Sequence, residues 1–119
     1  MWIQHPEIGA LSVVLADNLK TGSPDLSRVM IRARRSEHLQ LLRDRCASLA
    51  DAEVILTEGT NYKWRLIIDK PAFAAALVQL IDEIDYRNVK GRAHAREQEV
   101  GSGFVSALHR IWAVLLELQ

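Results

Sequence analysis

Basic and apolar residues alternate in two stretches of this 119-residue chain, 28–34 and 62–68, with a spacing suited to phosphate binding. Successive side chains of a β-strand point to opposite faces of a sheet, so every second residue shares a face. Each stretch would then present cations on one face and apolar side chains on the other. The cations are Arg28, Arg32, Arg34, Lys63 and Arg65. Because guanidinium and ammonium groups bind phosphate oxygens, these five residues form a candidate binding face.

Aromatic side chains decide how well such a face suits single-stranded nucleic acid, since bases stack on outward aromatic rings. The alternation places Tyr62 and Trp64 on the apolar side and leaves Met30 beside the arginines. A register shift of one residue would reverse this assignment. Three interpretations stay open: a solvated face, a homodimer surface whose arginines pair with acids, and a nucleic-acid interface.

A second basic segment, 87–96, follows a predicted helix that ends in acidic residues. Its cations are Arg87, Lys90, Arg92 and Arg96, and the preceding acids are Asp82, Glu83 and Asp85. Cations at a helix C-terminus complement the helix dipole and nearby carboxylates, which is a structural role. The functional alternative is a mobile basic arm that meets an acidic partner.

Residue types for catalysis and metal binding are present, but their spacing does not form a known site. The histidines are His5, His38, His94 and His109, and no pair has the i, i+4 spacing of a helical zinc motif. The single cysteine, Cys46, excludes an internal disulfide and falls on an apolar helix stripe, which favours a core position. The chain is therefore predicted to be no enzyme and to hold no metal and no cofactor.

The elements that would position these residues follow from periodicity and turn signals. Strands are expected at 8–16, 28–34, 53–57 and 62–68, and helices at 36–50, 69–86 and 104–118. Ser36 and Asp69 are expected to cap the first two helices, and Pro71 fits a first helical turn. The segment 87–103 is expected to be a loop with a short helical piece.

This order predicts a single α+β domain over residues 1–119, with a four-stranded antiparallel or mixed sheet in ββαββαα order. The favoured arrangement is ferredoxin-like and circularly permuted, with the strands in the spatial order first, second, fourth, third. A sequential order is the alternative. In the favoured order the two basic strands are central neighbours, and the first two helices leave one sheet face uncovered.

The last helix carries an apolar stripe that includes Ile111, Trp112 and Leu115. It could complete the core or form an interface with a second copy of the chain. Lysine plus arginine and aspartate plus glutamate number 15 each, so general attraction to polyanions is weak. No membrane span or secretory signal is found, which predicts a cytoplasmic protein.

Four strings, at 1–3 (MWI), 29–34 (VMIRAR), 84–90 (IDYRNVK) and 109–119 (HRIWAVLLELQ), resemble a family of small bacterial and phage-borne single-domain proteins of unassigned function. The resemblance implies a single-domain unit and no particular activity. We expect a small non-catalytic domain that binds a macromolecule. The favoured partner is a protein, which includes a second copy of the same chain. Nucleic-acid binding through the basic face and the 87–96 arm is the alternative. The resemblance implies a further alternative function, that of a phage-type inhibitor of a host nucleoprotein complex.

Overall fold

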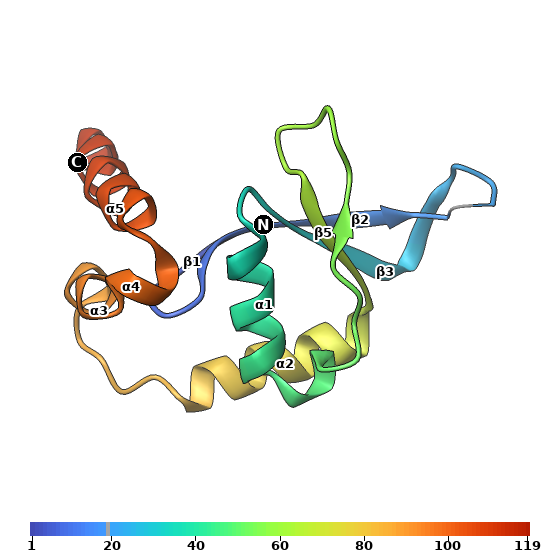
Figure 1. The fold of residues 1–119 in the computed structure, drawn as a ribbon, viewed down its shortest axis with the longest axis horizontal. Helices are drawn as coiled ribbons and strands as arrows, with labels where there is room; N and C mark the ends of the chain where they lie inside the picture. Colours follow the sequence, from blue (N-terminus) through green and yellow to red (C-terminus); the bar gives the residue numbers. More distant parts are fainter. Residues whose placement is uncertain (19) are drawn as a thin grey trace.

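A computed structural model describes residues 1–18 and 20–119 and contains an open five-stranded antiparallel sheet (Figure 1). The order across the sheet is β1-β2-β3-β5-β4. The strands are β1 (Trp2–His5), β2 (Gly9–Asp17), β3 (Pro24–Ala33), β4 (Ile55–Leu56) and β5 (Trp64–Asp69). The α+β class is confirmed, whereas the predicted four-stranded, ferredoxin-like sheet is not, because β1 adds an edge strand.

Strand β1 is an edge strand that the sequence pattern does not predict. It pairs antiparallel with β2, so that Trp2 lies opposite Ser12 and His5 opposite Gly9. The terminal ammonium group of Met1 donates a hydrogen bond to the carbonyl of Val13 over 2.9 Å. Four residues before a proline carry too little pattern to predict a strand, and the pairing with β2 stabilises this one.

Helices α1 (Ser36–Arg45) and α2 (Lys70–Asp82) cover one face of the sheet (Figure 1). Each follows a central strand directly, and the residues that alternate with the basic ones point toward them. Ile31, Ala33 and Leu66 are fully buried in this core. The predicted division of the two central strands into an apolar and a basic side is therefore correct over their regular parts.

The starts and ends of these helices differ from the predictions. Ser36 does not cap α1, since its hydroxyl donates to the carboxylate of Glu37. Asp69 occupies the position before α2, but its carboxylate pairs with Arg28 at 3.2 Å instead of capping the helix. Helix α1 ends at Arg45 and is followed by the short 3₁₀ helix η1 (Ala47–Leu49).

The C-terminal third is helical from residue 89 onward, where a largely irregular segment was expected up to residue 103. It comprises α3 (Val89–Ala95), α4 (Glu97–Val100), α5 (Ser102–Leu115) and the 3₁₀ helix η2 (Leu116–Leu118). The Asn88 side chain caps α3 by accepting a hydrogen bond from the Gly91 N–H over 3.0 Å. A second apolar cluster, centred on Val100 and Phe104, holds these helices together.

Within the described residues, no helix is long and apolar enough to cross a membrane.

Candidate nucleic-acid interface

The sheet face opposite α1 and α2, here called the open face, carries the basic residues of the central strands. In the register between β3 and β5, Arg32 lies opposite Arg65 and Met30 lies opposite Ile67. Arg28 is at the far end of this face, where Asp69 neutralises it. Lys63 precedes β5 and is exposed. The structure thus brings Arg32 and Arg65 together and separates Arg28 from them.

Tyr62 lies against the arginines of the open face, which corrects the prediction that it faces the core. The guanidinium carbon of Arg32 is 4.8 Å from the centre of the Tyr62 ring, and that of Arg34 is 5.0 Å from it. The alternation predicted from sequence fails here because β5 begins only at Trp64. Trp64 does pack partly buried against the core, as predicted.

The charges around Tyr62 are not neutralised by acids. Among residues 1–18 and 20–119, no carboxylate lies within 4.0 Å of the charged groups of Arg32, Arg34, Lys63 or Arg65. Their recorded polar contacts are neutral: Arg32 Nη2 donates to the Ser12 hydroxyl over 2.9 Å, and Arg65 Nε donates to the Tyr62 carbonyl over 3.3 Å. We call Arg32, Arg34, Tyr62, Lys63 and Arg65 the cationic patch. Unpaired cations on one surface attract anions locally, whatever the net charge of the chain.

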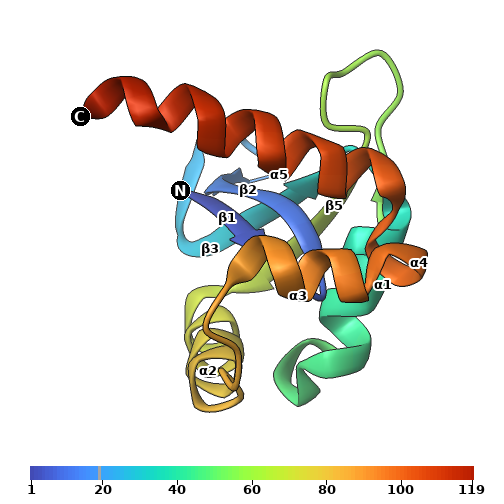
Figure 2. The ribbon, with the colours of Figure 1, turned by 90° about the vertical axis from the view of Figure 1, so that its left-hand side faces the viewer.

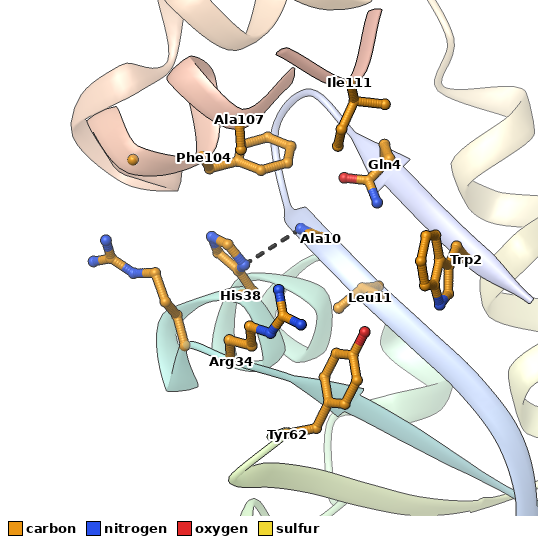
Figure 3. A pocket seen from close by; sticks show the side chains of 12 residues that line it. Trp2, Gln4, Ala10, Leu11, Arg34, His38, Tyr62, Phe104, Ala107 and Ile111 are labelled. Carbon is orange, nitrogen blue, oxygen red and sulfur yellow. Dashed lines mark hydrogen bonds between the residues drawn. The ribbon is translucent and has the colours of Figure 1, made fainter. Parts of the chain in front are cut away.

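A pocket of about 310 Å³ lies beside the cationic patch, between α5 and the open face of β1 and β2 (Figure 3). Its apolar walls include Trp2 from β1 and Phe104, Ala107 and Ile111 from α5. Arg34 and Tyr62 belong both to the pocket lining and to the patch. The side chain of Trp2 is 77% exposed, which leaves its ring accessible. The sequence pattern does not indicate this pocket, because it does not predict β1.

His38 fixes the helices that form one wall of the pocket. Its Nδ1 accepts a hydrogen bond from the Ala10 N–H over 3.3 Å (Figure 3). Its Nε2–H donates to the Val100 carbonyl over 2.9 Å. Burial lowers the pKa of His38 below its ordinary value, and the charge of Arg35 lowers it further. The imidazole is therefore neutral and fully bonded, which makes it a structural group rather than a proton donor to a substrate.

Three arginines converge on the buried carboxylate of Glu7, which follows β1. Arg45, Arg92 and Arg96 approach it at 3.3, 3.5 and 3.0 Å. Burial raises the pKa of Glu7, but the hydrogen bond from Arg45 and the charges of all three arginines outweigh it and hold this pKa below its ordinary value. These pairs attach α3 to the sheet domain.

Three of the four residues proposed as a basic arm thus belong to α3 or cap its end, namely Lys90, Arg92 and Arg96. Arg92 also pairs with Asp85 at 2.8 Å, the structural role weighed in the sequence analysis. Lys90 places its ammonium nitrogen 3.6 Å from the centre of the Trp112 ring. Arg87 is exposed.

Cys46, Glu83 and Asp85 were also candidates for chemistry, and each has a structural environment. Cys46 is buried at the end of α1, as expected of a core residue. Glu83 lies 3.8 Å from Arg45 and Asp85 pairs with Arg92, so both acids take part in ion pairs. In the part of the chain that the structure describes, no three His, Cys, Asp or Glu side chains gather as they would around a metal ion.

The candidate interface residues Ile111, Trp112 and Leu115 are exposed, on the half of α5 that extends beyond the sheet (Figure 2). Every residue from 111 to 119 is exposed, and Leu118 reaches 82%. The first half of the same helix is anchored by Phe104, Val105 and Leu108. The apolar stripe therefore completes a core at one end only.

Comparison with protein-family models, with curated proteins and with solved structures gives no match to this chain. The resemblance to small bacterial and phage-borne proteins, and the inhibitor role that it implies, stay predictions.

Proposed function

We propose that this chain is a non-catalytic binding domain whose open face binds single-stranded nucleic acid. One observation carries the proposal: the Tyr62 ring lies within 5.0 Å of the guanidinium groups of both Arg32 and Arg34, on a face whose patch cations have no acidic partner among the described residues. Aromatic rings and guanidinium planes both stack bases, and the same guanidinium groups bind the phosphates.

The absence of aromatic residues from the basic face was the main argument against this function in the sequence. Tyr62 and Trp2 remove that argument, since both line the pocket beside the patch. An antiparallel sheet with exposed aromatic and basic side chains is a known platform for single strands. A duplex buries its bases and offers nothing to stack, so the proposal is specific for single strands.

The four cations of the patch, Arg32, Arg34, Lys63 and Arg65, limit how many phosphates the domain can neutralise there. Contacts made by the four cations of the patch predict a slope of about −3 in a plot of log affinity against log salt, at about 0.7 per phosphate for a single strand. Affinity is then modest and falls steeply with salt.

Fluorescence anisotropy with labelled oligonucleotides tests the proposal. We expect a single-stranded probe to bind at low salt, and a duplex of the same sequence to bind more weakly. Tyr62→Leu keeps the bulk of the side chain but removes the ring, and should weaken binding about 5-fold or more, the contribution of one stacked base. Tyr86→Leu, in the segment between α2 and α3, is the matched control and should bind like the wild type. If no oligonucleotide binds at low salt, the proposal is wrong.

A second candidate function is protein binding, including self-association, through the exposed end of α5. The supporting observation is the run of exposed residues from 111 to 119, most of them apolar. Burying such a strip on a second copy would stabilise both chains. Light scattering after size exclusion decides this: a dimer that Leu115→Glu converts to a folded monomer supports it, and a wild-type monomer at high concentration contradicts self-association.

A further inference from the structure

We infer that the pocket between α5 and the open face holds one base of the bound strand while the cationic patch holds the adjoining phosphates. The inference rests on the proposed function and names the subsite where a base enters the protein. Nothing in the sequence pattern indicated a base pocket, because Trp2 and Gln4 of its lining belong to β1, which the pattern does not predict.

The size of the pocket suits one nucleoside. Small-molecule pockets span roughly 300 to 1,000 Å³, and at about 310 Å³ this one is at the small end of that range. Trp2, Phe104 and Ile111 give its lining the apolar surface that suits a planar base. The exposed indole of Trp2 offers the largest flat surface, and stacking on an aromatic face is favourable for every base.

The position of the pocket connects the base to the phosphates. Arg34 lines the pocket and contacts Tyr62, so its guanidinium group lies where the base site and the cationic patch meet. Arg35 also lines the pocket, but the Glu37 carboxylate lies 3.6 Å from its Nε and weakens its attraction for another anion. A phosphate beside the bound base is therefore expected on Arg34 rather than on Arg35.

Gln4 provides the polar group that a base edge can use. It lines the pocket, and its Oε1 is shielded and accepts no hydrogen bond from the described residues (Figure 3). An unpaired buried acceptor costs about 1–3 kcal/mol. The terminal torsion of a glutamine is broad, so the Gln4 amide can rotate, and we expect its oxygen to accept a hydrogen bond from an N–H of the base edge.

A pocket-filling variant separates the base site from the phosphate contacts. Ala107 lies on the α5 wall, so Ala107→Leu should occupy the space of the base without changing any charge. Val114→Leu, on the exposed half of the same helix, is the matched control. We expect Ala107→Leu to weaken binding of an oligothymidine about 5-fold or more and to leave the salt slope unchanged. Val114→Leu should bind like the wild type.

Trp2 fluorescence reports the base directly. In a Trp112→Phe background the remaining indoles are Trp2 and the partly buried Trp64. An oligothymidine should quench the part of the emission that Trp2→Phe removes, and a fully abasic strand of equal length should not. If the pocket accepts a free nucleotide, thymidine monophosphate should also quench the Trp2 emission, at a higher concentration than the strand. Quenching by the strand alone would show that the pocket binds a base only within a polynucleotide. With N3-methylthymine, which lacks the edge N–H, the strand should bind more weakly, and Gln4→Met should abolish this difference.

The outcomes distinguish the two proposals. Oligothymidine binding by anisotropy that neither quenches Trp2 nor responds to Ala107→Leu would overturn the pocket and leave the open face as the binding surface. Absence of binding by any strand or by the nucleotide would overturn both.

Discussion

The guanidinium carbon of Arg34 lies 5.0 Å from the centre of the Tyr62 ring. The two residues lie at the ends of different strands, and the alternation of side chains placed them on opposite faces of the sheet. The contact arises because both residues lie just outside their regular strands, β3 and β5, where the alternation of faces no longer holds. It places an aromatic ring among cations, and this changes a solvated basic face into a surface that can stack a base and hold its phosphate.

Gly9 is predicted to be essential for the docking of His38. A Cβ at this position would lie 2.4 Å from the imidazole ring, and its φ of +119° disfavours any residue with a side chain. Gly9→Ala should lower the free energy of unfolding by roughly 3 kcal/mol, from overpacking and backbone strain together. Gly103→Ala, which meets no atom within 4 Å, should change it little. Urea denaturation measures both, and equal stability of the two variants would contradict the contact.

Glu7→Gln tests whether the buried carboxylate holds α3 on the sheet domain. The Glu7 side chain is only 8% exposed and is shared by three arginines. Losing its charge should destabilise the protein by roughly 2 kcal/mol, less than for a fully buried pair because the arginines are partly exposed. Glu99→Gln, which removes an exposed partner of Arg96, should cost less than about 0.5 kcal/mol. The same loss in both variants would show that Glu7 has no special role.

Stability should fall as the pH is lowered below about 6.5, the ordinary pKa of histidine. Burial lowers the pKa of both His5 and His38 in the folded protein. The unfolded chain therefore takes up protons first, so the stability present above pH 6.5 is lost as the pH falls toward the folded pKa values. Urea unfolding at pH 7.5, 6.5 and 5.5 measures this loss, and His38→Gln should reduce it. A free energy of unfolding that increases as the pH is lowered from 7.5 to 5.5 would contradict the neutral, bonded imidazole.

The sequence predicted those parts of the fold that long, regular patterns specify. Residues 28–34 and 62–68 alternate cleanly, and their pairing through β3 and β5 is present. Strand β1 is too short for a pattern, and it forms because β2 provides a partner. The segment 87–103 was expected to be a loop with a short helical piece because its arginines and glycines indicate a loop, whereas ion pairs to Glu7 and the Asn88 cap stabilise helix α3 there.

The candidate site was predicted in part. The arginines of the open face follow from strand parity, and Arg32 and Arg65 are where parity places them. Tyr62 and Trp2 were not predicted, because one precedes its strand and the other lies on the missed strand. Contacts that depend on how a strand begins, or on a pairing far along the chain, leave no periodic signal in the sequence.

The salt dependence of oligothymidine binding tests the central claim most directly. The account predicts a slope of about −3 for the wild type, and Arg34→Gln should weaken binding and reduce the slope by about 0.7. Lys70→Gln removes one charge at the start of α2, away from the patch, and should leave both quantities unchanged. Equal effects of the two substitutions, or no binding by the wild type at low salt, would contradict a nucleic-acid interface on the open face.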